Sequence, residues 1–149
     1  MRDDATPESR IAGECLAGRV RVLSRVVTGI YDDALRPHKV RVSQMNVLVA
    51  VAAMGPVRAG DVCRRLRLDK STLSRDLDRL LDRGWVRATP GAGRSQDLEA
   101  TPAGRAVIRK VLPAWEEAQA RVRGVLGAAL TEGLCEAADR LREADIDRR

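Results

Sequence analysis

Hydroxyl and cationic side chains crowd into one short stretch of the sequence, between positions 70 and 79. Serine and threonine hydroxyls can exchange hydrogen bonds with base edges, and an arginine guanidinium can pair with guanine through two parallel hydrogen bonds. Lysine and arginine also neutralise phosphate oxygens. Such a set indicates contact with a nucleic acid, and its members are Lys70, Ser71, Thr72, Ser74, Arg75 and Arg79.

The same stretch has the apolar period of an α-helix. Leucines fall at i, i+4, i+7 and i+8 and form one buried stripe, which consists of Leu73, Leu77, Leu80 and Leu81. Asp69 precedes the stripe as an N-cap, and Gly84 follows it where a helix would stop. A shorter helix over residues 61–66 comes first, so the pair predicts a helix-turn-helix whose second helix enters a major groove. The alternative is an ordinary helical hairpin with a solvated charged face.

A β-hairpin is predicted directly after this helix pair. Residues 85–88 and 96–100 have strand character, and a glycine-rich turn over residues 89–95 joins them. Residues 57–59 could add a short strand beside the hairpin. A helix-turn-helix followed by a hairpin is a winged helix. Arg94 at the tip is placed to enter a narrow minor groove, where the potential is most negative.

Within this fold the polar side chains take separate roles. Arg75 is the candidate for reading a guanine, and Ser71 or Thr72 for contacting a base edge or a thymine methyl group. Arg79 and Arg83 lie further along the helix and are expected to contact phosphate.

With these elements in place, the sequence resembles the MarR family of bacterial transcription regulators. The matching segments follow in order at 68–75, 77–80, 83–86 and 101–104, and the resemblance extends from about residue 20 to residue 126. It implies a homodimer with one winged helix per subunit and with the terminal helices at the dimer interface. It also implies binding of double-stranded DNA at a pseudo-palindromic operator, usually as a repressor that is released by a ligand or by oxidation.

Two positions depart from the pattern of that family. Arg67 stands where the family usually has a glycine in the turn, and a left-handed backbone there would cost a non-glycine residue about 1–2 kcal/mol. At the wing tip, Ala92, Gly93 and Arg94 stand where the family commonly has Asp-Arg-Arg, so only the last arginine is matched. The reduced wing leaves open a dimeric protein-interaction module that has lost DNA binding.

Long helices are predicted on both sides of the winged helix. The first runs from about Ser9 to Leu35 and is too long to be buried within one small domain, so burial against a second subunit is expected. Another begins at Thr101–Pro102 and runs to about Gly127. It should kink near Pro113, because an interior proline removes a helical hydrogen bond.

Two more helices complete the prediction. Ser43 is expected to cap an apolar core helix that ends near Met54, and Thr131 to cap a last helix over residues 132–145. The fold class is therefore mainly α with a small β-hairpin wing, a winged helix-turn-helix domain joined to a helical dimerisation stalk. The expected divisions are a disordered N-terminus at 1–8, the helical dimerisation region at 9–38 and 102–146, and the winged helix-turn-helix DNA-binding domain at 40–101.

The DNA binding of such a regulator must itself be regulated, and the sequence leaves two mechanisms open. In the first, a small and mostly apolar effector lodges between the stalk and the winged helix, beside Tyr31, His38, Met45 and Trp115. A simpler interpretation makes Met45 and Trp115 ordinary core residues. In the second, Cys15 is a redox sensor, because hydroperoxide sensors of the resembled family carry a reactive cysteine in the first helix, hydrogen-bonded by tyrosines. One of those tyrosines has no counterpart here.

Composition and charge exclude other classes of protein. The 149 residues carry a formal net charge of +6, and residues 40–100 contribute +4 of it, from eleven Lys and Arg against seven Asp and Glu. A basic centre between near-neutral flanks favours nucleic acid over a membrane surface. The sequence shows no signal peptide and no apolar run near the ~20 residues of a membrane span, so a cytoplasmic protein is expected.

Residues for catalysis or metal binding are scarce. A single histidine and three cysteines far apart in the sequence provide neither a nucleophile–base pair nor a zinc site, and no phosphate-binding glycine motif is present. We therefore expect no enzyme, no metal and no cofactor. The adjacent carboxylates of Asp32 and Asp33 point about 100° apart on a helix, which indicates a solvated helix end.

Overall fold

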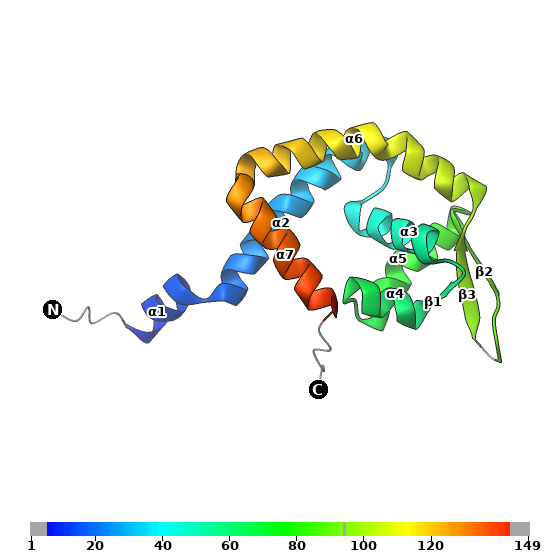
Figure 1. The fold of residues 1–149 in the computed structure, drawn as a ribbon, viewed down its shortest axis with the longest axis horizontal. Coiled ribbons are helices and arrows are strands. Elements are labelled where there is room, and N and C mark those ends of the chain that lie inside the picture. Colours follow the sequence, from blue (N-terminus) through cyan, green and yellow to red (C-terminus); the bar gives the residue numbers. More distant parts are fainter. Residues whose placement is uncertain (1–5, 94, 144–149) are drawn as a thin grey trace.

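The computed structural model describes residues 6–93 and 95–143. Its elements are α1 (Pro7–Glu14), α2 (Leu16–Leu35), the 3-10 turn η1 (Arg36–His38), α3 (Val42–Met54), β1 (Val57–Arg58), α4 (Ala59–Leu66), α5 (Lys70–Asp82), β2 (Val86–Pro90), β3 (Gln96–Ala100), α6 (Pro102–Leu126) and α7 (Ala128–Glu143). Figure 1 shows α3, α4, α5 and the sheet gathered in one body, which we call the head, while α6 leaves it to run beside α2. We call α1, α2, α6 and α7 the stalk.

The hydrophobic core lies mainly in the head. Helix α3 is apolar around most of its circumference, as its sequence predicts, and Val47, Leu48 and Val51 are fully buried. Val62 of α4 and Leu80 of α5 belong to the same buried cluster. This aliphatic packing fixes α4 and α5 against α3.

The sheet has three antiparallel strands in the order β1–β3–β2. Leu98 at its centre pairs with Val57 on one side and with Ala88 on the other, and its side chain is buried against the head. The predicted hairpin and the short extra strand are therefore confirmed. Strand β2 extends further than expected, because Thr89 and Pro90 belong to the strand and not to the turn. The fold is mainly α with a small sheet, as predicted.

The first part of the stalk differs from the single helix that the sequence predicts. Residues 7 and 8, expected to be disordered, already belong to α1, and Thr6 caps this helix by accepting a hydrogen bond from the N–H of Ser9 at 3.3 Å. The helix is interrupted at Cys15, whose backbone is extended. Residues 1–5 lie outside the described part of the chain.

The start of α3 shows that the predicted Ser43 cap is wrong. Ser43 lies inside the first turn, and the N-cap position belongs to Arg41. The N–H of Val42 instead donates to Oδ1 of Asp32 at 2.8 Å. Asp32 is therefore not simply a solvated carboxylate, because it joins the end of α2 to the start of α3.

The predicted N-cap of α6 is confirmed, whereas the predicted N-cap of α7 is wrong. Thr101 caps α6 by accepting a hydrogen bond from the N–H of Gly104 at 3.1 Å. Pro113 lies inside α6, and Figure 1 shows this helix curved along its length. Thr131 does not cap the last helix: Gly127, with a φ of +76°, separates α6 from α7, and Thr131 lies within α7. The predicted end of this helix, at residue 145, lies outside the described residues.

The turn between α4 and α5 contains a left-handed residue that is not glycine. Arg67 has φ 54° and ψ 38°, a conformation that costs a non-glycine residue about 1–2 kcal/mol. The N–H of Leu68 donates to the carbonyl of Cys63 at 3.0 Å and the N–H of Arg67 to that of Arg64 at 3.4 Å, a pattern in which glycine usually ends a helix. The arginine thus adopts the backbone of a glycine turn, and its guanidinium donates to the carbonyl of Leu141 in α7.

This turn gives a first prediction about stability. Arg67→Gly should be more stable than Arg67→Ala by about 1 kcal/mol, because only glycine relieves the left-handed backbone. Both variants lose the arginine side chain, so the pair isolates the backbone effect. Urea denaturation followed by circular dichroism measures the difference, and equal midpoints would show that the turn carries no strain.

Candidate nucleic-acid interface

Helix α5 is held by its apolar back and by both of its ends. Leu80 is fully buried in the head. At the N-terminus, Asp69 accepts a hydrogen bond from the N–H of Thr72 at 2.8 Å. At the C-terminus, Gly84 has a φ of +66°, and the N–H of Trp85 donates to the carbonyl of Leu80 at 2.9 Å. Both predicted ends of the helix are confirmed, so α5 is a well-positioned element.

Four of the predicted contact residues form an exposed polar face on α5. They are Lys70, Ser74, Arg75 and Arg79. Their spacing places Lys70 beside Ser74 and Arg75 beside Arg79, one turn apart. Within residues 6–93 and 95–143, none of these four side chains has a hydrogen bond or an ion pair. Their donors are therefore available to a ligand outside the chain.

The hydroxyls of Ser71 and Thr72 have partners within the chain. Ser71 Oγ donates to Asp69 Oδ1 at 2.6 Å, and Thr72 Oγ1 donates to Asp69 Oδ2 at 2.8 Å. These two side chains therefore help to build the cap of α5. What they retain for a base is the acceptor capacity of each oxygen and the methyl group of the threonine.

The cap makes the stability of α5 dependent on pH. Hydrogen bonds from the hydroxyl of Ser71 and from the N–H and hydroxyl of Thr72 hold the pKa of Asp69 well below its usual range. A lowered pKa in the folded state adds stability that is present above the unfolded pKa, near 4, and is lost as the pH falls below it. We expect Asp69→Asn, which caps without titrating, to lose less stability than wild type between pH 6 and pH 3. Urea denaturation at both pH values tests this, and equal losses would contradict it.

Arg83 is exposed, but its side chain also has partners within the chain. Its Nη1 donates to the carbonyl of Lys39 at 2.6 Å. Its guanidinium carbon lies 4.8 Å from the centroid of the Trp85 ring. These contacts give Arg83 a role within the chain, and its predicted phosphate contact stays a prediction.

The wing is a short hairpin whose tip is only partly described. The N–H of Gly91 donates to the carbonyl of Ser95 at 2.9 Å, and Gly93 has a φ of +73°. Along the strands, Arg87 pairs with Glu99 at 2.6 Å. Arg94, the predicted minor-groove residue, lies outside the described residues, so its role stays a prediction.

The structure brings together only two of the four predicted effector residues. Tyr31 and Trp115 lie together, with ring centroids 6.4 Å apart, and the Tyr31 hydroxyl donates to Oε1 of Gln119. Burial raises the pKa of Tyr31, and the nearby charge of Arg123 partly opposes this. Met45 belongs to the buried core cluster, in line with the simpler interpretation of that residue. His38 is half-buried in η1.

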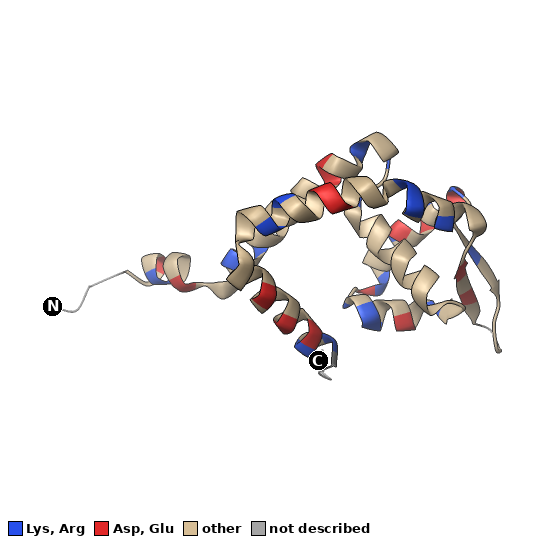
Figure 2. Cartoon of the chain, turned by 45° about the horizontal axis from the view of Figure 1, so that its top comes forward, with Lys and Arg blue, Asp and Glu red and all other residues tan. Residues whose placement is uncertain are grey.

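Lys, Arg, Asp and Glu positions are distributed over both the head and the stalk (Figure 2). In the described ranges, 6–93 and 95–143, no group of three His, Cys, Asp or Glu residues could hold a metal ion. None of the helices in these ranges is long and apolar enough to cross a membrane.

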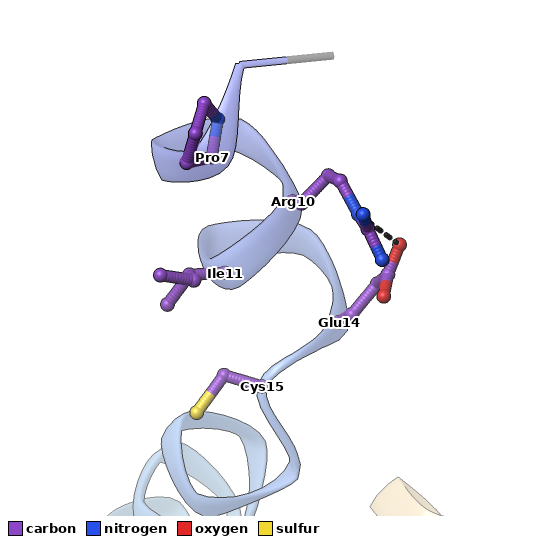
Figure 3. Close-up of a pocket in the computed structure, with 5 residues that line it drawn as sticks. All are labelled: Pro7, Arg10, Ile11, Glu14 and Cys15. Atoms are coloured by element: carbon purple, nitrogen blue, oxygen red, sulfur yellow. Dashed lines mark ion pairs between the residues drawn. The ribbon is translucent and has the colours of Figure 1, made fainter. Parts of the chain in front are cut away.

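A surface depression of about 550 Å³ marks the junction of α1 and α2 (Figure 3). It is lined by Pro7, Arg10, Ile11, Glu14 and Cys15. Arg10 and Glu14 form an exposed ion pair at 3.8 Å, and Cys15 is an exposed free thiol. A helical rise of 1.5 Å per residue separates Cys15 from Tyr31 by about 24 Å along α2. Tyr31 of the same chain is therefore too distant to hydrogen-bond to this thiol.

Three residues that join neighbouring elements were not identified from the sequence as doing so. Asp32 and Arg83 act through partners that are distant in the sequence, so no local pattern marks them. Gly104 lies in the first turn of α6, where a Cβ atom would lie 2.1 Å from the carbonyl oxygen of Trp85. A glycine inside a helix lowers its stability relative to alanine. Its presence in a predicted helix could therefore have indicated that another backbone segment packs closely there.

Comparison with known proteins connects this geometry to a family. A model described as the MarR family matches residues 38–95, from η1 through the hairpin turn. The regulator PecS of Dickeya dadantii is 24% identical over 138 residues, which cover 81% of this chain and 83% of PecS. MosR of M. tuberculosis, solved in complex with DNA, is 27% identical with a TM-score of 0.73, over 85% of this chain and 96% of MosR. The winged-helix segment of the chain, residues 38–95, therefore matches the MarR family.

Two further structures show how closely the MarR-family fold is kept. A mutant form of MarR from E. coli, complexed with operator DNA, has a TM-score of 0.77 at 18% identity, over 89% of this chain and 96% of that one. Bordetella bronchiseptica BpsR, whose DNA binding is regulated by 6-hydroxynicotinic acid, has a TM-score of 0.77 at 21% identity, with the same two coverages. At these identities the likeness concerns the fold.

Proposed function

We propose that this protein is a transcriptional regulator of the MarR family that binds double-stranded DNA through α5. The observation that carries the proposal is the exposed face of Lys70, Ser74, Arg75 and Arg79, whose side chains have no partner in the described part of the chain. A capped helix with such a face at its N-terminal half fits a major groove, with Arg75 toward base edges and Arg79 toward phosphate. The DNA complex of the related MosR supports this assignment.

The protein acts as a homodimer whose stalk is completed by a second copy. Apolar side chains stay exposed along the stalk, among them Leu16 (76%), Val20 (62%) and Val125 (64%). Burying these side chains against another subunit would be favourable at about 25 cal/mol per Å² of apolar surface. In this proposal residues 9–38 and 102–146 dimerise, and residues 40–101 bind DNA. Two copies of α5 would then read half-sites about one helical turn, ~34 Å, apart.

The same proposal includes repression that is relieved by a small effector. The region beside Tyr31 and Trp115 lies between α2 and α6, which carry the head. BpsR, a protein of the same fold, is regulated by a small organic molecule. A ligand inserted there would change the separation of the two α5 helices and so lower operator affinity. Such a regulator works in the cytoplasm, where the chromosome is.

Fluorescence anisotropy tests the proposed function. A labelled duplex from the gene's own upstream region is compared with a scrambled duplex over a salt series, and sedimentation gives the oligomeric state. We expect selective binding by a dimer, with affinity that falls steeply as salt rises. Absence of binding at low salt would contradict the DNA assignment and favour a protein-interaction module.

A further inference from the structure

The end of α5 is fastened to both long helices of the stalk. Arg83 joins it to the corner that follows α2, through its hydrogen bond to the carbonyl of Lys39. Thr101, the cap of α6, joins it to the other side: its hydroxyl donates to the carbonyl of Gly84 at 2.6 Å, and its N–H donates to that of Trp85 at 3.0 Å. Residues 83–85 therefore form a joint where the head meets the stalk.

The corner that Arg83 contacts is itself firmly built. Lys39 has a left-handed backbone with φ 57°, and its N–H donates to the carbonyl of Arg36 at 2.9 Å. Leu35 and Val40 on either side of the corner are 0% and 3% exposed. The carbonyl of Lys39 is therefore a fixed acceptor, and any movement of α2 would carry it along.

The contacts of the Arg83 guanidinium couple the end of α5 to the corner that follows α2. Nη1 donates to the Lys39 carbonyl, and the guanidinium carbon lies over the ring of Trp85, 4.8 Å from its centroid. A cation–π contact and a directional hydrogen bond together restrict the position of an arginine side chain. Arg83 is the C-cap residue of α5, so this contact restrains the C-terminal end of the helix.

We propose that Arg83 is a positioning residue that sets the distance between the two α5 helices of the dimer, and hence the half-site spacing that the protein accepts. The inference rests on the proposed function. Arg75 lies eight residues before Arg83, about 12 Å along the helix. A rotation of about 10° at the joint would therefore move Arg75 by roughly 2 Å, which is enough to misplace a contact with a base edge.

Operators with altered spacing test the proposal. Wild type, Arg83→Ala, Arg83→Lys and the control Arg79→Ala are titrated against the native operator and against versions with one base pair added or removed between the half-sites. We expect Arg83→Ala to lose about tenfold on the native spacing, to discriminate poorly among spacings, and to keep the salt slope of wild type. Arg83→Lys, which can still donate to Lys39, should retain part of the preference.

The control separates this role from a phosphate contact or a structural one. Arg79→Ala should weaken binding to every spacing by the same factor and reduce the salt slope by about 1. The same behaviour in Arg83→Ala would overturn the proposal. A lower melting temperature of Arg83→Ala with an unchanged preference for spacing would overturn it as well.

A measurement without DNA keeps the inference distinct from the proposed function. Hydrogen exchange should show lost protection over residues 36–42 in Arg83→Ala but not in Arg79→Ala, because only the first variant breaks the contact with Lys39. Unchanged protection in both variants would overturn the proposed role of Arg83 but would leave the proposed DNA binding untouched. A wild-type protein that binds no duplex would overturn the proposed function, and the spacing role with it.

Discussion

Replacing Gly104 with alanine should lower the free energy of unfolding by about 3 kcal/mol or more. A Cβ atom at this position would lie 2.1 Å from the carbonyl oxygen of Trp85 and 3.2 Å from Cδ1 of Leu48. The first of these atoms is backbone, and it is held by the N–H of Thr101, so it cannot move without separating α6 from the end of α5. Urea denaturation followed by circular dichroism measures the loss.

Gly60 supplies the matched control in the head. It lies in the first turn of α4, where an added Cβ would meet only the tip of the Arg64 side chain, at 4.0 Å. Gly60→Ala should therefore be neutral or stabilising by up to about 1 kcal/mol, as expected for a helical glycine. If both variants unfolded at the same denaturant concentration, the close packing of α6 on Trp85 would be contradicted.

Arg75→Ala should weaken operator binding by about 1–3 kcal/mol, roughly ten- to a hundredfold, and should relax the sequence preference. Arg75 is exposed on α5, and its guanidinium has no partner in the described part of the chain. Its removal should therefore leave the fold unchanged, and the loss would report on DNA alone. Competition between the operator and scrambled duplexes gives the ratio of affinities.

Arg79→Ala is the control for this variant, because Arg79 lies one turn further along the same face. Its loss should be similar on both duplexes, with a smaller salt slope. If Arg75→Ala weakened operator and scrambled DNA equally, Arg75 would be a phosphate contact and the base-reading role would fall to another residue of α5.

Much of the head could be predicted because its signals are local. Asp69 and Thr101 cap their helices through N–H groups three residues away, and Gly84 ends α5 as a left-handed residue. Such contacts repeat in any protein with the same short pattern. The leucine stripe of α5 was equally readable, because its period is a property of the helix itself.

The errors arose where a distant group took the place of the one that the local pattern predicts. Ser43 has the residue type of a cap, but the first N–H of α3 already donates to Asp32, ten residues earlier. Arg83 has the residue type of a phosphate contact, and its sequence pattern does not reveal that its side chain also donates to a carbonyl 44 residues away. Neither partner can be assigned before the fold is known, so the side chains of the interface were easier to name than the residues that position them.

If a second copy completes the stalk, as proposed above, the stability of this protein depends on its concentration. Helix α1 buries none of its side chains within the chain, and the exposed apolar side chains of α2 would find cover in a second copy. When folding and association are coupled, each tenfold dilution removes about 1.4 kcal/mol of apparent stability per dimer. The rate at which the protein is synthesised would then help to determine which fraction of it is folded.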